Sequence, residues 1–186
     1  MPVDHLKLAA YLVFIGSWLV LLVVAALGAI PYLGRAADPT PIRPAVVIGT
    51  LLQAASVACI TLTLPTGPLQ PHRAELAAVL VLAPLAAALL VWVLRSTPRR
   101  REPETLVTTG AYGWLRHPMY AALFAMLLAT GLLASSRLPF LLAVISYIAG
   151  TELRVAVEES DLAHKFPAEF PAYKLRTRWR YLPGVR

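Results

Sequence analysis

Three long apolar runs, at residues 8–30, 45–64 and 76–94, constrain the fold of this 186-residue chain more than any other feature. At a rise of 1.5 Å per helical residue, each run is long enough to cross about 30 Å of hydrocarbon. Only 15% of the residues are charged, whereas a soluble domain usually has about a quarter. The sequence therefore predicts an all-α integral membrane protein.

Two shorter apolar runs follow at residues 120–134 and 138–150, and Ser135-Ser136-Arg137 joins them. Either run alone is short for a membrane span. As a tight helical hairpin they can enter and leave the membrane together, provided that the helices continue past the lipid boundary. We therefore expect five transmembrane helices within a single domain, residues 1–186. Residues 1–95 hold three spans, and residues 96–186 hold the hairpin and the tail.

The distribution of basic residues predicts the orientation of these spans, because cytoplasmic loops are enriched in Lys and Arg. With the N-terminus outside and the C-terminus inside, 14 of the 17 basic residues are cytoplasmic. The three left outside are Lys7, Arg73 and Arg137. The net charge of +7 then reports contact with an anionic membrane face rather than with nucleic acid. Cys59 is the sole cysteine, and no cluster has metal-ligand spacing, so we expect neither an intrachain disulfide nor a metal site.

The first unusual stretch, residues 105–120, reads TLVTTGAYGWLRHPMY and lies before the fourth run. Gly110 and Gly113 permit tight turns, and Pro118 suits the first turn of a helix. Unpaired N–H groups at that helix start, with Arg116 and His117 beside them, are typical of a site for an anionic group. The alternative is an ordinary basic, aromatic loop at the membrane interface.

The second stretch, residues 154–162, continues the fifth run and reads RVAVEESDL. Arg154 and Glu158 are four residues apart, so they share one helix face. Ionisable residues where a helix leaves the membrane favour a function, although a solvated amphipathic helix is the simpler alternative. The tail, residues 166–183, mixes aromatic residues and Arg, and we expect it to lie against the headgroups and cap the site.

In this order the two stretches resemble the isoprenylcysteine carboxyl methyltransferase family and its phospholipid N-methyltransferase relatives. The resemblance covers about 80 residues, 104–183, and the first three spans match only in being hydrophobic. The matching residues are Thr105, Leu106, Val107, Thr108, Gly110, Tyr112, Arg116, His117, Pro118, Tyr120, Arg154, Glu158, Glu159, Leu162, Phe166 and Tyr173. Pro167 and Phe170 stand where the family has Gly and Tyr, which puts the acceptor in doubt more than the cofactor.

The resemblance implies an S-adenosylmethionine-dependent enzyme whose cofactor pocket lies on the cytoplasmic side, between the loop before helix four and the extension of helix five. It implies a membrane location, which we expect to be a prokaryotic cytoplasmic membrane. The implied cofactor-binding residues are Glu104, Thr105, Leu106, Val107, Tyr112, His117, Pro118, Met119, Tyr120 and Glu158. The catalytic candidates are Arg154, Arg116 and Glu159, with Arg154 facing the acceptor carboxylate.

The chemistry favours a carboxylate acceptor, because a carboxylate is already ionised at neutral pH and needs no general base. An Arg fork can hold its oxygens. An amine acceptor would need to lose a proton and would prefer a carboxylate neighbour. The implied partner is a lipophilic or lipidated acceptor, such as a prenylcysteine-type or other lipid acid.

Two other classes stay open at this point. Membrane sterol-type reductases that use NADPH have a related Gly-x-Tyr and Arg-His loop, but usually with Asn where this chain has Pro118. A non-enzymatic membrane scaffold is the third interpretation. The sequence names neither the acceptor nor the oligomeric state.

Overall fold

The computed structural model describes residues 4–29, 43–61, 71–97, 105–134 and 136–184, and no β-strand occurs among them. The helices are α1 (His5–Ala29), α2 (Pro44–Thr61), α3 (Arg73–Ser96), the short 3-10 helix η2 (Gly110–Gly113), α4 (Pro118–Ala134), α5 (Arg137–Lys165) and α6 (Phe170–Arg176). The prediction of an all-helical chain therefore holds over the described residues.

Helices α1, α3 and α5 are long and apolar enough to cross a membrane. Helices α2 and α4 are apolar but shorter over the residues described, and the last three residues of the predicted second run, 62–64, lie outside them. The positions of all five helices agree with the five apolar runs. That each of the five spans a bilayer stays a prediction.

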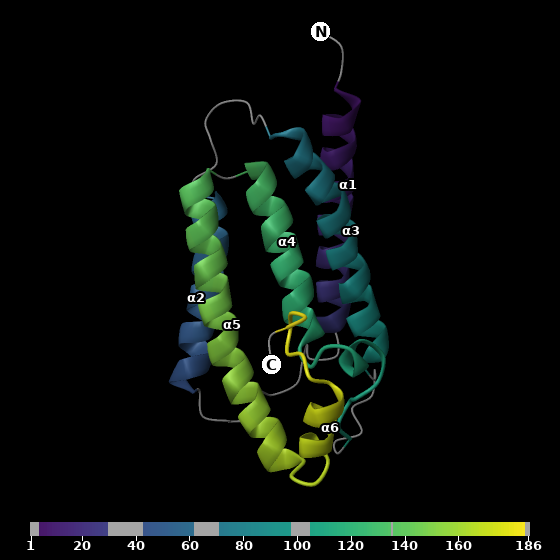
Figure 1. The fold of residues 1–186 in the computed structure, drawn as a ribbon, viewed down its shortest axis with the longest axis vertical. Coiled ribbons are helices and arrows are strands. Elements are labelled where there is room, and N and C mark those ends of the chain that lie inside the picture. The colour runs from purple at the N-terminus through teal and green to yellow at the C-terminus, as the bar shows by residue number, and fades with distance from the viewer. Residues whose placement is uncertain (1–3, 30–42, 62–70, 98–104, 135, 185–186) are drawn as a thin grey trace.

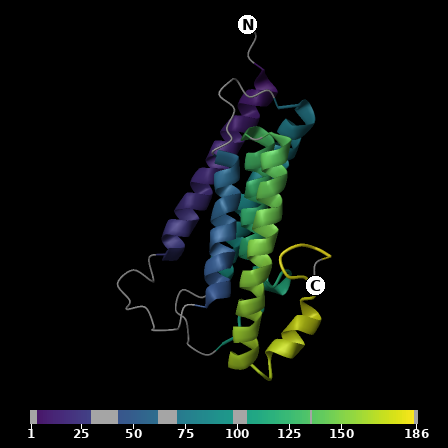
Figure 2. The same ribbon diagram turned by 90° about the vertical axis from the view of Figure 1, so that its left-hand side faces the viewer.

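The five apolar helices lie side by side along the longest axis of the molecule (Figures 1 and 2). Their outward faces carry exposed aliphatic side chains, among them Leu12 and Leu19 on α1 and Leu138 and Ile145 on α5. Helix α6 lies at the end of the bundle opposite the N-terminus. This arrangement fits an all-α membrane protein, and its orientation in the membrane stays a prediction.

Helix α3 packs between α1 and α4 and supplies much of the core. Its buried positions Leu76, Val79, Ala83, Ala86 and Leu90 recur every three or four residues, which is the spacing of one helix face. Small alanines in this row allow the neighbouring helices to approach closely. This packing holds the C-terminal end of α3 next to the loop that precedes α4.

Helix α5 is continuous for 29 residues, from Arg137 to Lys165. The prediction that the fifth apolar run continues as a helix beyond Gly150 is therefore confirmed. The acidic and basic residues of the second sequence stretch lie on this extension, which projects past the other long helices in Figure 1.

Candidate active site

The loop before α4 is attached to the end of α3. Gly110 has a φ of +62°, a conformation that favours glycine, and a Cβ there would collide with the side chain of Ser96. The Ser96 hydroxyl accepts a hydrogen bond from the Ala111 N–H at 3.0 Å. The turn predicted at Gly110 is thus present, and the neighbouring helix end fixes its position.

The tail folds back and pairs with the start of α4. The N–H of Arg116 donates to the Trp179 carbonyl at 3.0 Å, and the N–H of His117 donates to the Arg180 carbonyl at 2.8 Å. Both N–H groups precede the first turn of α4, so the tail backbone occupies donors beside the predicted anion site. That the N–H groups of the helix start itself receive an anion stays a prediction.

The Arg116 side chain is buried and bonded to the protein through two of its nitrogens. Its Nε donates to Glu159 Oε1 at 2.7 Å, and its Nη1 donates to the carbonyls of Thr177 and Arg178, each at 2.7 Å. Arg116 therefore joins three segments, namely the loop, the α5 extension and the tail.

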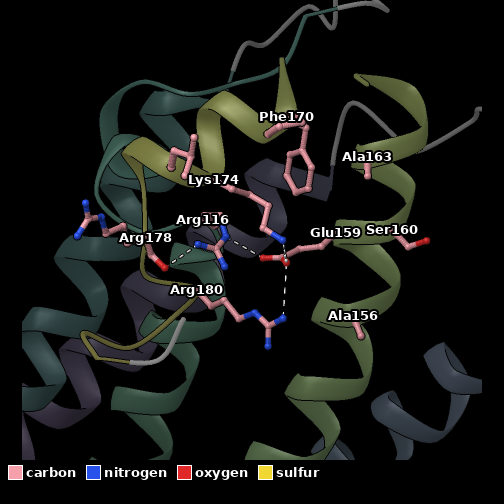
Figure 3. A pocket seen from close by; sticks show the side chains of 11 residues that line it. Arg116, Ala156, Glu159, Ser160, Ala163, Phe170, Lys174, Arg178 and Arg180 are labelled. Atoms are coloured by element: carbon pink, nitrogen blue, oxygen red, sulfur yellow. Dashed lines mark hydrogen bonds and ion pairs between the residues drawn. The ribbon is translucent and has the colours of Figure 1, made fainter. Parts of the chain in front are cut away.

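Glu159 is the centre of a cluster of cations at the same place. Besides Arg116, its carboxylate lies 3.4 Å from Lys174 Nζ and 3.6 Å from an Nη2 atom of Arg180. Figure 3 shows these three side chains converging on the Glu159 carboxylate from the loop, α6 and the tail. An open groove of about 1080 Å³, which we call the tail groove, lies here between α5 and α6. Its polar lining consists largely of side chains that already contact Glu159.

A second cluster forms beside the first, where α4 begins next to α5. The Tyr120 hydroxyl donates to Glu158 Oε1, and His117 Nδ1 lies 3.3 Å from Glu158 Oε2. His117 Nε2 lies 3.5 Å from Glu159 Oε1, so the imidazole stands between the two carboxylates. Burial alone would lower the pKa of His117, but the two carboxylates outweigh it and raise that pKa above its ordinary value.

Arg154 of α5 also contacts this second cluster, on the side that faces α2. One terminal nitrogen of its guanidinium lies 3.9 Å from Glu158 Oε1, and the guanidinium carbon lies 5.6 Å from the centre of the Tyr120 ring. The structure therefore brings His117, Tyr120, Glu158 and Arg154 together, and we call these four residues the motif cluster. Arg116 and Glu159 adjoin it.

Residues 77–169, half of the chain, match the family model of phospholipid methyltransferases. The chain belongs to the phospholipid methyltransferase family. Over 76 residues it is also 33% identical to the protein-S-isoprenylcysteine O-methyltransferase of Saccharomyces cerevisiae, a match that covers 41% of this chain and 32% of that enzyme. The suspected relationship is thereby confirmed.

The segment that matches the family model runs from α3 into the stretch after α5. It therefore contains the whole motif cluster. The yeast relative is aligned over about a third of its own length. Family membership therefore supports a membrane methyltransferase, whereas the methyl donor and the acceptor are matters for proposal.

The other residues that were predicted to bind the cofactor are not members of the motif cluster. Glu104 falls outside the described residues. Thr105 is exposed, and Leu106 and Val107 are half-buried. The Tyr112 hydroxyl lies 3.5 Å from Thr97 Oγ1, on the side of α3. Pro118 is buried and Met119 is exposed, both in the first turn of α4. The tail groove is lined by Arg116 and Glu159 but by none of the residues predicted to bind the cofactor.

Sequence reasoning missed two groups of residues that this family member places around the site. Glu152 accepts hydrogen bonds from Arg180 at 2.8 Å and from the Tyr181 hydroxyl at 2.7 Å. Thr50 and Gln53 of α2 contact Arg154. A signal existed for Gln53, because an amide inside an apolar membrane run usually has a specific partner. Among the described residues, no group of three or more His, Cys, Asp and Glu side chains is placed to hold a metal ion.

Proposed function

We propose that this protein transfers a methyl group from S-adenosylmethionine to the carboxylate of a lipophilic acceptor, at the motif cluster. The observation that carries the proposal is the meeting of Arg154 and Glu158, one cation and one anion on adjacent turns of α5, beside the loop residues His117 and Tyr120. Both halves of the site lie in the segment that matches the family.

The residues of the motif cluster fit the polar parts of S-adenosylmethionine. Glu158 has a side chain that is 40% exposed, so its oxygens can accept hydrogen bonds from an ammonium group or from ribose hydroxyls. His117 Nδ1 faces Glu158 and its buried Nε2 lies 3.5 Å from the Glu159 carboxylate, so the imidazole can hold Glu158 in place beside the cofactor. We therefore assign cofactor binding to Glu158, His117 and Tyr120, with Pro118 and Met119 adjoining.

The acceptor end of the site is assigned to Arg154. Its Nε is buried without a hydrogen-bond partner in the described structure, and its side chain is 28% exposed. A carboxylate is the natural ligand for a guanidinium fork. On the same two helices, and within three residues of Arg154 or of the α2 residues that contact it, Val47, Leu51 and Leu153 are exposed. A lipid chain lying along these side chains would place its carboxylate at Arg154 from within the bilayer.

The chemistry requires position more than acid–base assistance. S-adenosylmethionine supplies an electrophilic methyl group on a sulfonium. A carboxylate oxygen of the acceptor forms the new C–O bond as the S–CH₃ bond breaks, which yields a methyl ester and S-adenosylhomocysteine without a proton transfer. Arg154 holds the oxygen in line. Because opposite charges cancel as the methyl group moves, shielding from water favours the reaction.

We assign Arg116 and Glu159 a positioning role in this reaction. The Arg116 guanidinium already holds one carboxylate and two carbonyls, and the Glu159 carboxylate already contacts several cations. Together they fix the loop, the α5 extension and the tail relative to each other. This frame places His117 and Tyr120, next to Arg116 in the chain, beside Glu158 on α5.

The chemistry of the product tests the proposal. Purified protein is incubated with S-adenosylmethionine labelled in the methyl group and, separately, with an N-acylated prenylcysteine, a long-chain fatty acid and a phospholipid with an amine headgroup. Label in a product that mild base releases as methanol would show a methyl ester and support the proposal. Base-stable label on the amine lipid would show N-methylation and contradict the carboxylate assignment.

Two variants locate the reaction within the structure. Arg154→Ala should abolish ester formation. Arg43→Ala removes another Arg of the same end of the bundle, whose exposed guanidinium pairs with Asp161, and should leave ester formation unchanged. Ester formation at the wild-type rate in Arg154→Ala would rule out the assigned site.

A further inference from the structure

Helix α2 touches the extension of α5 through their backbones. A Cβ on Gly150 would lie 2.5 Å from the Gly49 carbonyl oxygen, and a Cβ on Gly49 would lie 2.8 Å from the Gly150 carbonyl oxygen. The same added Cβ on Gly49 would lie 2.7 Å from Cγ of Arg154. The aliphatic stem of Arg154 therefore rests on the bare backbone of α2 at Gly49.

The Arg154 guanidinium then meets two oxygen acceptors of α2. Its Nη1 donates to Thr50 Oγ1 at 3.2 Å and to Gln53 Oε1 at 3.4 Å. These contacts are longer than the best charged hydrogen bonds, but both come from the same helix and both point to the same nitrogen. They leave Nε without a partner among the described residues.

Neighbouring groups fix the direction of both acceptors. The Thr50 hydroxyl donates its proton to the Val46 carbonyl at 2.8 Å, so its oxygen is left as an acceptor for Arg154. The Gln53 amide donates through Nε2 to Thr151 Oγ1 at 3.0 Å, so its carbonyl oxygen is turned towards Arg154. Since a guanidinium has only donors, both groups are oriented for a cation.

The acceptors on α2 are also neutral. The sequence of α2, from Pro44 to Thr61, contains no charged residue. Thr50 and Gln53 can therefore hold the guanidinium in place without cancelling its charge. Within 4.0 Å, Glu158 is the one carboxylate of the described residues that faces it, at 3.9 Å, and Tyr120 and His117 share that carboxylate.

We propose that Thr50 and Gln53 are positioning residues that present the charged guanidinium of Arg154 to the acceptor carboxylate. Helix α2 is then part of the active site, although it lies outside the segment, residues 77–169, that matches the family. This inference rests on the proposed methyl transfer to a carboxylate. It gives the N-terminal half of the chain a role in binding the acceptor rather than the cofactor.

The sharpest test exchanges the neutral acceptor for a charged one of the same shape. In Gln53→Glu, the introduced carboxyl occupies Arg154 and competes with the acceptor. At pH 8 the KM for a prenylcysteine or fatty acid should rise roughly tenfold or more, since one charge-assisted contact of Arg154 is withdrawn from the acceptor. The difference from the wild type should shrink as the pH falls and the introduced carboxyl is protonated. The affinity for S-adenosylmethionine, measured by titration, should stay at the wild-type value.

Two further variants separate positioning from general packing. Gln53→Met keeps the length of the side chain but loses its oxygen, and should raise the KM for the acceptor at every pH. Gly49→Ala pushes on the Arg154 stem and on the Gly150 carbonyl, so it should raise the same KM and also lower the unfolding temperature, whereas Gln53→Met should leave that temperature near the wild-type value. Gly16→Ala is the matched control, because no atom lies within 4 Å of the Cβ it would add, and it should behave as the wild type.

The possible failures are distinguishable. A wild-type KM for the acceptor in Gln53→Glu across the pH range would overturn the role of α2 while leaving methyl transfer intact. Loss of S-adenosylmethionine affinity in Gln53→Glu or Gln53→Met would also overturn it, since α2 would then support the fold as a whole. If the wild type methylates none of the carboxylate acceptors, both the proposed function and this inference are contradicted.

Discussion

The Arg116 guanidinium donates through Nε to Glu159 Oε1 across 2.7 Å, and the two side chains are only 4% and 7% exposed. This buried pair connects the loop before α4 with the extension of α5. The two sequence stretches that resemble the methyltransferase family therefore meet through a direct contact.

Arg116→Ala should destabilise the protein strongly, because it leaves the Glu159 carboxylate buried without its closest cation. Removing one partner of a buried ion pair typically costs about 3–5 kcal/mol. Thermal unfolding in detergent measures the effect. Arg43→Ala is a matched control, since Arg43 also pairs with a carboxylate at 2.7 Å but with both side chains about half exposed. Such exposed pairs contribute about 0–1 kcal/mol. Equal unfolding temperatures for the two variants would contradict the structural role given to Arg116.

Glu152→Gln should loosen the tail. The Glu152 carboxylate accepts hydrogen bonds from Arg180 and from Tyr181, and Tyr181 is only 2% exposed. Weakening these charged contacts should increase the open population of the tail roughly tenfold, which limited trypsin cleavage after Arg176 or Arg178 would record. The control is Glu169→Gln, which neutralises an exposed carboxylate in the tail itself. Unchanged cleavage in Glu152→Gln would show that other contacts hold the tail.

The stability of the protein should fall as the pH rises from the ordinary His pKa of about 6.5, through deprotonation of His117. Glu158 and Glu159 raise the pKa of His117, so the protonated imidazole stabilises the folded state. This stabilisation is complete below the unfolded pKa of about 6.5 and is lost as the pH rises through the folded pKa. Thermal unfolding between pH 6 and pH 9 should show the loss in the wild type and a smaller loss in His117→Asn. Parallel pH profiles for the two proteins would assign the loss to other groups.

The helices could be predicted from the sequence because they depend on local hydrophobicity. All five apolar runs became helices, and the prediction that α5 continues to the acidic motif was right. The two motifs were expected at the same end of the bundle, and the contacts of Tyr120 and His117 with Glu158 agree with that expectation.

The rest of the site depends on contacts between distant parts of the chain. Nothing in the local pattern indicates that the carbonyls of Trp179 and Arg180 pair with the N–H groups of Arg116 and His117. For that reason the sequence did not predict that the tail pairs with the two residues just before α4. The contact between Gly49 and Gly150 likewise needs the packing of two helices about 100 residues apart to be known.

The topology of the chain is directly testable. The proposed orientation follows from the 14 cytoplasmic and three external basic residues. In the structure, α6 lies at the opposite end of the bundle from the N-terminus, as an odd number of spans requires (Figure 1). A reporter fused to the C-terminus should be cytoplasmic and one fused to the N-terminus external. Both reporters on the same side would contradict five spans.

The central claim is that Glu158 binds S-adenosylmethionine and Arg154 binds the acceptor, although the two side chains lie 3.9 Å apart. Titration of S-adenosylmethionine into the wild type, Glu158→Ala and Arg154→Ala tests it most directly, with turnover on a lipid acid measured beside it. Glu158→Ala should weaken binding roughly ten- to a hundredfold, the effect of losing a charge-assisted hydrogen bond. Arg154→Ala should bind S-adenosylmethionine nearly as the wild type does and should lose turnover, and Arg154→Lys should restore little of it. Loss of S-adenosylmethionine binding in Arg154→Ala, or full turnover in both alanine variants, would contradict the account.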